Sequence, residues 1–393
     1  MRLAVLKERR PGEARVAATP ETVKKFMALG CEVAVEQGAG DASGFPDAEY
    51  AAAGAQVLPD AASALAGAGI VLKVRAPLGA GEGTVDELAL IPRGALLVGT
   101  LGADAQAAGA YAALGVDAAS MELLPRITRA QSMDVLSSQA NLAGYRAVID
   151  AAATFGRAMP MMMTAAGTVP AARVFVMGAG VAGLQAIATA RRMGAIVTAT
   201  DVRPAAKEQV ESLGAKFVAV EDDEFKQAET SGGYAKEMSA EYRRKQGELV
   251  ASHIAKQDIV VTTALIPGRP APKLVTAAMV AAMRPGSVIV DLAVERGGNC
   301  EASKPGEVTV TDNGVTIVGH LNSPGRLAAS ASALYARNLF AFVETLVDKE
   351  TKALRPQWED ELMRATLLTR DGHVVHENFA PKTAPVAPTG AAA

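Results

Sequence analysis

The chain has 393 residues, enough for two or three domains that each bury a hydrophobic core. Its formal net charge of −3 provides no strongly basic face, which argues against nucleic acid as the main partner. Two cysteines, Cys31 and Cys300, lie far apart and match no disulfide or metal spacing, as expected in a reducing cytoplasm.

The first third of the chain predicts an α/β unit. Thr19 can cap a helix whose first residue is Pro20 and which closes near Gly30. Short apolar runs predict strands at residues 2–6, 32–36, 70–74, 95–100 and 116–119. Alternating strands and helices imply a mostly parallel sheet.

A long helix is expected over residues 135–155, and the methionines Met161 to Met163 that follow are expected to fill a core. Apolar runs then predict the six strands of a full Rossmann sheet, at residues 173–177, 195–200, 216–218, 258–262, 287–291 and 315–318. Helical periodicity from about residue 328 to 347 predicts a helix that packs back on the first unit.

The predicted fold is therefore α/β, with two Rossmann-like parallel-sheet domains and a cleft between them. The first domain is expected to be discontinuous, with residues 1–135 and 326–379. The second comprises residues 136–325 and carries the nucleotide motif described next. Residues 380–393, rich in Pro and Ala, are expected to form a flexible tail.

The most informative motif follows the strand predicted at 173–177. It reads Gly178-Ala179-Gly180-Val181-Ala182-Gly183 and runs into a predicted helix. The three glycines provide a tight turn, room for a pyrophosphate against the backbone, and close packing of helix on strand. The helix N-terminus offers free N–H groups to the phosphates. The motif predicts a dinucleotide site.

The next strand ends on Asp201, followed by Val202 and Arg203. A carboxylate at this point accepts hydrogen bonds from a ribose 2′-OH and repels a 2′-phosphate. Arg203 alone would favour NADP(H). The strand-end aspartate is the stronger signal, so we predict NAD(H).

Two further segments contain candidate ligand-binding groups. In the turn from Arg126 to Asp134, Arg126 and Gln131 can donate hydrogen bonds and Asp134 can accept them, as orienting a carboxamide and a ribose requires. The alternative is a helix-capping cluster on a solvated surface. Residues 225–246, centred on Gly233 and Tyr234, predict either a mobile lid that touches ligand or an ordinary surface loop.

Groups for acid–base or metal chemistry are scarce. His253, His373 and His376 are expected to be solvated, His320 to be structural, and no metal-ligand or nucleophile motif occurs. Oxidising an alcohol or an amino acid requires a group that takes the proton. Hydride transfer between two nicotinamide rings requires only distance, alignment and exclusion of water.

In the segments 126–139, 161–170, 232–238 and 291–300 the chain resembles the NAD(H)-binding domain I, or soluble α subunit, of proton-translocating NAD(P) transhydrogenase. The resemblance covers nearly the whole chain apart from the tail. It implies that Arg126, Gln131 and Asp134 position the nicotinamide end with Ser137 beside them, and that no general acid or base is needed. It also implies nucleotide contacts by Asp201, by Tyr234 on a closing loop, and by Gln246 and Leu265.

The same resemblance implies that NADP(H) is bound on a partner subunit and that protons are conducted by a separate membrane subunit. We therefore expect a homodimer that is cytoplasmic and peripheral on the inner face of the cell membrane through those partners. A membrane span of its own is not expected, because the N-terminal apolar run stops at Lys7 and no other run is long enough.

Two alternative interpretations remain. Alanine dehydrogenase has a similar two-domain fold, and Arg15 and Lys73 resemble the residues that hold pyruvate in that enzyme. The histidine expected there falls at about Gly102, however, and the cleft aspartate falls at Glu295. The second alternative is an NAD(H)-sensing module, against which the dense polar groups from Arg126 to Asp134 argue.

Overall fold

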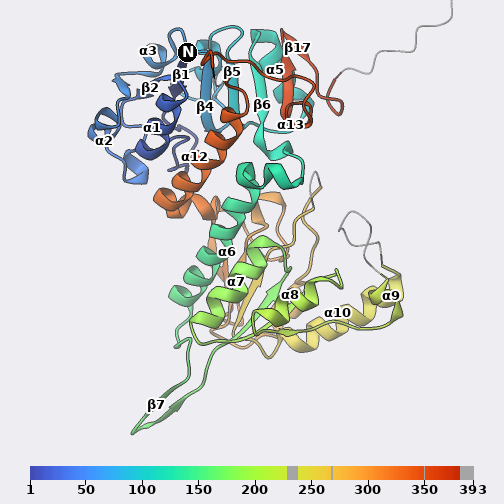
Figure 1. The fold of residues 1–393 in the computed structure, drawn as a ribbon. Coiled ribbons are helices and arrows are strands. Elements are labelled where there is room, and N and C mark those ends of the chain that lie inside the picture. The colour runs from blue at the N-terminus through green and yellow to red at the C-terminus, as the bar shows by residue number, and fades with distance from the viewer. Residues whose placement is uncertain (228–237, 267–268, 349, 381–393) are drawn as a thin grey trace, which may run out of the picture. The chain divides into compact units, whose positions relative to one another are not determined.

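The computed structural model describes residues 1–227, 238–266, 269–348 and 350–380. It divides into two compact units, each built around its own sheet (Figure 1). The first unit comprises Met1–Ser138 and the described residues from Ala328 onward. The second is Gln139–Leu327.

The sheet of the first unit has the order β3-β2-β1-β4-β5-β6-β16-β17. The first six strands are parallel: β1 (Arg2–Val5), β2 (Glu32–Glu36), β3 (Gln56–Leu58), β4 (Ile70–Arg75), β5 (Leu96–Thr100) and β6 (Asp117–Ser120). Two antiparallel strands extend the edge, β16 (Leu367–Arg370) and β17 (His373–Val374). The strand order reverses between β1 and β4, which makes this pair the topological switch point of the sheet.

Both faces of this sheet are covered by helices and turns, as a parallel sheet requires. Leu3 and Val5 face one core, whereas Ala4 and Leu6 face the other. The covering elements are α1 (Pro20–Ala28), η1 (Asp41–Ser43), α2 (Asp47–Ala52), α3 (Ala61–Leu65), α4 (Glu87–Leu90), α5 (Ala105–Leu114), η2 (Met121–Leu123), η3 (Thr128–Met133), α12 (Ala328–Glu344) and α13 (Glu361–Thr366).

Helix α1 shows how local sequence starts an element here. Thr19 and Thr22 form a capping box in which each side chain bonds the other's backbone N–H, and Pro20 follows the cap. Phe26 on the buried face meets Phe340 of α12 edge to face, with ring centroids 5.3 Å apart. The two helices lie side by side (Figure 1), so α12 returns to the first unit as its periodicity indicated.

The sheet of the second unit has the order β11-β10-β9-β12-β13-β15-β14. Its strands are β9 (Arg173–Met177), β10 (Ile196–Thr200), β11 (Lys216–Phe217), β12 (Ile259–Thr262), β13 (Val288–Asp291) and β15 (Thr316–Val318), all parallel, with β14 (Val308–Val310) antiparallel at one edge. The six parallel strands follow the Rossmann order 3-2-1-4-5-6. The predicted α/β class with two Rossmann-like sheets is confirmed.

Helices also cover both faces of the second sheet. Val174 and Val176 of β9 face one core, and Phe175 and Met177 face the other. The remaining elements of this unit are most of α6 (Val135–Thr154), then α7 (Val181–Arg192), α8 (Ala206–Ser212), α9 (Asp223–Lys226), α10 (Ala240–Ile254), α11 (Ala277–Ala281), η4 (Val294–Arg296) and η5 (Ser323–Leu327).

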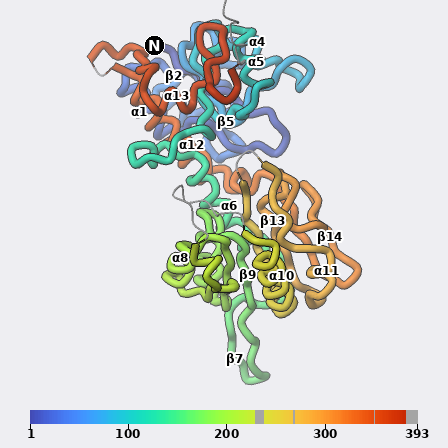
Figure 2. The backbone as a smooth tube through the Cα atoms, turned by 90° about the vertical axis from the view of Figure 1, so that its right-hand side faces the viewer, coloured from blue at the N-terminus to red at the C-terminus, as the bar shows by residue number. Residues whose placement is uncertain are grey.

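The prediction that Met161 to Met163 fill a core is wrong. Met161 and Met163 are 60% and 79% exposed. Strand β7 (Met162–Thr164) pairs with β8 (Gly167–Val169) in a hairpin that projects from the second unit (Figures 1 and 2). An apolar run alone does not indicate whether a sheet face covers it, and here the hairpin carries the run away from the core.

Two of the histidine predictions are also wrong. His253 accepts or donates a 2.8 Å hydrogen bond with Thr198, and its ring lies edge-on to Phe175. His376 is only 5% exposed and stacks on Phe379. Burial lowers the pKa of His253, which fits a neutral, packed ring.

None of the helices in the described residues combines the length and the apolar composition needed to cross a bilayer.

Candidate functional site

The glycine-rich turn lies at the carboxyl end of β9, the central strand of the second sheet. Gly178 has φ +105°, and a Cβ there would lie 2.5 Å from Thr263 Oγ1. A Cβ on Gly183 would lie 1.8 Å from the carbonyl oxygen of Gly178. Both positions therefore require glycine for the fold itself, one for the turn and one for the packing of α7 against it.

Gly180 differs from the other two glycines. It is exposed, and a Cβ on it would meet no heavy atom of the described residues within 4 Å. It is also the N-cap of α7, and no side chain in the described structure caps that helix. The N–H groups of the first turn, from Val181 to Gly183, have no acceptor within a helix. Open space beside these donors suits the pyrophosphate of a dinucleotide.

Asp201 stands at the end of β10, beside the glycine turn. Its Oδ2 accepts a 2.7 Å hydrogen bond from the backbone N–H of Ala179, which ties the carboxylate to the turn. Arg203 donates to the same carboxylate from Nε at 2.9 Å and from Nη2 at 3.1 Å. Val202 between them is 51% exposed. The predicted ribose acceptor and the neighbouring cation thus form one ion pair.

Gln246 and Leu265 border the same edge of the second sheet. The Gln246 amide accepts from the Val220 N–H at 2.8 Å and donates to Thr200 Oγ1 at 3.2 Å, so it holds the end of β10 in place. Leu265, beyond β12, is 53% exposed. Gly233 and Tyr234 lie outside the described residues.

The polar turn of the first unit lies between η2 and α6. Arg126 and Gln131 are exposed there. Asp134 caps α6: its Oδ1 accepts from the Ser137 N–H at 2.9 Å and its Oδ2 from Ser137 Oγ at 2.5 Å. The helix-capping alternative therefore describes the contact between Asp134 and Ser137, while the exposed Gln131 makes no part of that cap.

Two clamps hold this turn that no sequence pattern indicated. Asn338 of α12 is 8% exposed; its Nδ2 donates to the Ser132 carbonyl and its Oδ1 accepts from Ser138 Oγ, both at 2.7 Å. Arg129 forms a two-pronged ion pair with Asp360, at 2.8 and 2.9 Å. Asn338 is some 200 positions away in the chain, and only the fold of the first unit brings it here.

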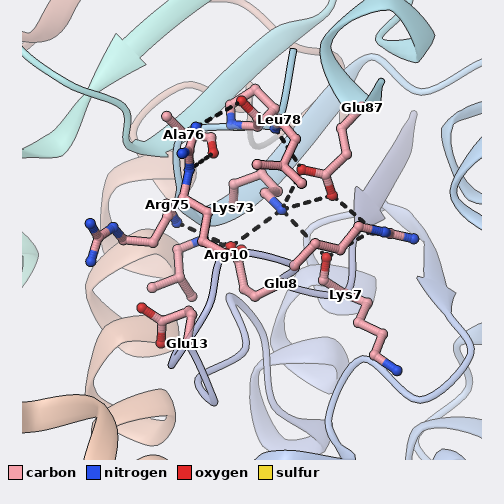
Figure 3. Close-up of polar contacts among 12 residues, drawn as sticks. Lys7, Glu8, Arg10, Glu13, Lys73, Arg75, Ala76, Leu78 and Glu87 are labelled. Carbon is pink, nitrogen blue, oxygen red and sulfur yellow. Dashed lines mark hydrogen bonds and ion pairs between the residues drawn. The ribbon is translucent and has the colours of Figure 1, made fainter. Parts of the chain in front are cut away.

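The switch point of the first sheet, between β1 and β4, contains a buried charge cluster (Figure 3). Lys73 of β4 is 1% exposed, and its Nζ lies 3.1 and 3.2 Å from the two Glu87 oxygens and 3.3 Å from Glu8. Glu87 also accepts from Arg9 at 2.8 Å, and Glu8 from the Val74 N–H at 2.7 Å. Burial raises the pKa of Glu8, although Lys73 and the Val74 hydrogen bond oppose that shift.

A second buried pair lies close to this cluster. Arg15 is 7% exposed and donates to the Glu13 carboxylate from Nε at 2.8 Å and from Nη2 at 2.7 Å. Arg15 and Lys73 are the two cations of the alanine dehydrogenase alternative, and each is paired with a glutamate of the chain itself. Gly102, where that alternative expects a histidine, has φ +87°, a left-handed conformation that histidine rarely adopts.

Family models match both halves of the chain. Residues 4–143 match the N-terminal domain of the alanine dehydrogenase/PNT family, and residues 147–377 match its C-terminal domain. One relative, an NAD(P) transhydrogenase subunit alpha of Rhodospirillum rubrum, is 59% identical over 96% of this chain and 98% of its own length.

A solved structure and a more distant relative complete the comparison. The crystal structure of transhydrogenase from Sinorhizobium meliloti is 58% identical, with a TM-score of 0.86 over 95% of this chain and all of that one. An alanine dehydrogenase of Halomonas elongata is 30% identical over 97% of this chain and 96% of its own length. The chain therefore belongs to the alanine dehydrogenase/PNT family and, within it, to the alpha subunits of NAD(P) transhydrogenase.

Proposed function

We propose that this chain is the NAD(H)-binding component of the transhydrogenase and transfers hydride directly between NADH and NADP⁺ bound on a partner subunit. The observation that carries the proposal is Gly180, an open position at the uncapped N-terminus of α7 with Asp201 beside the turn. The nicotinamide ring supplies the hydride. The chain's own residues bind and orient the dinucleotide.

The polar turn of the first unit is proposed to hold the nicotinamide end. Arg126 and Gln131 would donate to the carboxamide and ribose, and Asp134 and Ser137 would accept and donate beside them. No proton moves in a hydride transfer between two nicotinamides, so these groups act by positioning. The clamps from Asn338 and Asp360 on this turn support a role that depends on fixed geometry.

The partner subunits also belong to the proposal. The relatives are named as alpha subunits, which supports assembly with subunits that bind NADP(H) and conduct protons in the membrane. We further propose a homodimer on the inner face of the cell membrane, held there by these partners.

The first experiment measures NADH-dependent reduction of an NADP⁺ analogue by the purified chain, with and without a transhydrogenase NADP-binding domain. We expect activity only when that domain is added. Absence of activity with it would contradict the proposal. NADH oxidation with pyruvate and ammonia would instead support an amino-acid dehydrogenase.

A second experiment tests positioning at Gln131. The substitution Gln131→Asn shortens the side chain by one methylene and keeps the amide, so we expect the transfer rate to fall roughly tenfold or more while NADH affinity changes little. Gln56→Asn makes the same change on the exposed edge strand β3 and serves as the matched control. If affinity and rate fell together at Gln131, the positioning role would be wrong.

A further inference from the structure

Arg203 and Asp201 form a closed pair at the end of β10. The carboxylate accepts four hydrogen bonds: Oδ1 from the backbone N–H and the Nε of Arg203, and Oδ2 from Ala179 N–H and from Nη2 of Arg203. A carboxylate has about four acceptor positions, so these contacts fill its capacity. A ribose hydroxyl can bind Asp201 only by competing with Arg203.

The two members of the pair are unequally exposed. The Asp201 side chain is 7% exposed, whereas that of Arg203 is 32% exposed. An incoming phosphate would therefore meet the guanidinium first. A guanidinium fork matches phosphate oxygens as well as it matches a carboxylate. In this structure the fork is held by the carboxylate instead.

We infer that Arg203 is a specificity-determining residue whose guanidinium is withheld from a 2′-phosphate by Asp201. The inference rests on the proposed NAD(H) function and concerns the same nucleotide position. A 2′-phosphate has to draw Arg203 away from Asp201 while facing that carboxylate's negative charge. A 2′-hydroxyl faces no such repulsion and gains an acceptor as Arg203 shifts. Selectivity for NAD(H) thus belongs to the pair and not to Asp201 alone.

The test measures dissociation constants of NADH and NADPH for the purified full chain, by titration calorimetry and without any partner subunit. In Asp201→Asn we expect NADH affinity to fall and NADPH affinity to rise, each by roughly tenfold, because the carboxylate no longer neutralises Arg203. In the double variant Asp201→Asn/Arg203→Gln the gain for NADPH should disappear. Arg203→Gln alone should leave NADPH binding weak.

Arg284→Gln is the matched control. Arg284 is 52% exposed and pairs with Asp258 at 3.5 Å, at the opposite edge of the same sheet, so the variant removes the same charge away from the nucleotide turn. We expect it to change neither affinity by more than about twofold. If Asp201→Asn does not fold, as judged by its circular dichroism and melting temperature, Asp201→Ser replaces it.

The outcomes separate the inference from the proposed function. A wild-type chain that binds NADH, with an Asp201→Asn variant that gains no affinity for NADPH, overturns the inference and leaves NAD(H) binding in place. A gain that persists in the double variant also overturns it, because Arg203 would then have no role in phosphate binding. A wild-type chain that binds neither nucleotide overturns the proposed function and the inference together.

Discussion

The two sheets of this protein share the strand order 3-2-1-4-5-6, yet the carboxyl ends of their central strands differ in what occupies them. Between β9 and β12 the chain leaves an open glycine turn and an uncapped helix N-terminus. Between β1 and β4 it places Lys73 among Glu8, Glu87 and Arg9. Ligands of such sheets bind at the switch point.

The difference shows that a strand order provides a place for a ligand without requiring one. At the first switch point the chain's own carboxylates satisfy the buried cations, so no external anion is needed for charge balance. At the second, the backbone donors of α7 have no such internal partner. Only the second switch point therefore has the features of a nucleotide site.

The largest effect is expected from breaking the first switch point. Glu87→Gln removes the carboxylate that Lys73 and Arg9 share and leaves buried positive charge, which should lower the free energy of unfolding by about 3–5 kcal/mol. Denaturant unfolding of the purified chain measures the loss. Glu82→Gln, at the half-exposed pair with Arg10, should cost less than about 1 kcal/mol. Equal losses at the two positions would contradict a distinct role for the buried cluster.

At the second switch point two glycines should respond in opposite ways. Gly183→Ala places a Cβ 1.8 Å from the Gly178 carbonyl and should destabilise the chain by about 1–3 kcal/mol. Gly180→Ala meets open space among the described residues and should cost under about 1 kcal/mol, yet lower NADH affinity by filling the space proposed for the pyrophosphate. Thermal melts and NADH titrations measure both. NADH binding by Gly180→Ala at wild-type strength would argue against the site.

The clamp on the polar turn should have an intermediate effect. Asn338→Ala leaves the Ser132 carbonyl and the Ser138 hydroxyl without this partner, which should cost about 1–3 kcal/mol of stability. Because the turn carries Gln131, hydride transfer should slow while the NADH dissociation constant changes little. Arg129→Ala breaks the more exposed clamp with Asp360 and should have a smaller effect on both. A transfer rate at the wild-type level in folded Asn338→Ala would restrict Asn338 to a structural role.

The smallest effect concerns pH at the first switch point. Burial raises the pKa of Glu8 above the 4.5 of an exposed glutamate, so the folded chain holds this proton more tightly than the unfolded chain. The stability that Glu8 contributes is therefore complete below pH 4.5 and is lost as pH rises through the raised folded value. Glu8→Gln cannot ionise. Denaturant unfolding from about pH 4 to about pH 8 should show wild type losing stability relative to the variant; parallel curves would contradict the shift.

Much of the second sheet could be predicted from local sequence. The strand 173–177 and the roles of Gly178 and Gly183 follow from side-chain burial and backbone sterics, which act over a few residues. The short strands β3, β14, β16 and β17 could not be predicted, because two or three edge residues carry little periodicity. The exposed hairpin of Met162 shows the same limit, since the run itself gives no sign of what covers it.

The sequence by itself determined the α/β class, the glycine turn and the strand-end Asp201, because these depend on residues adjacent in the chain. Tertiary structure alone decided that Lys73 is enclosed by Glu8 and Glu87 and that Asn338 clamps the turn before α6. The physical reason is distance along the chain. Charges and amides tens to hundreds of residues apart become partners only when the order of the strands brings their loops to one edge, and no local pattern contains that order.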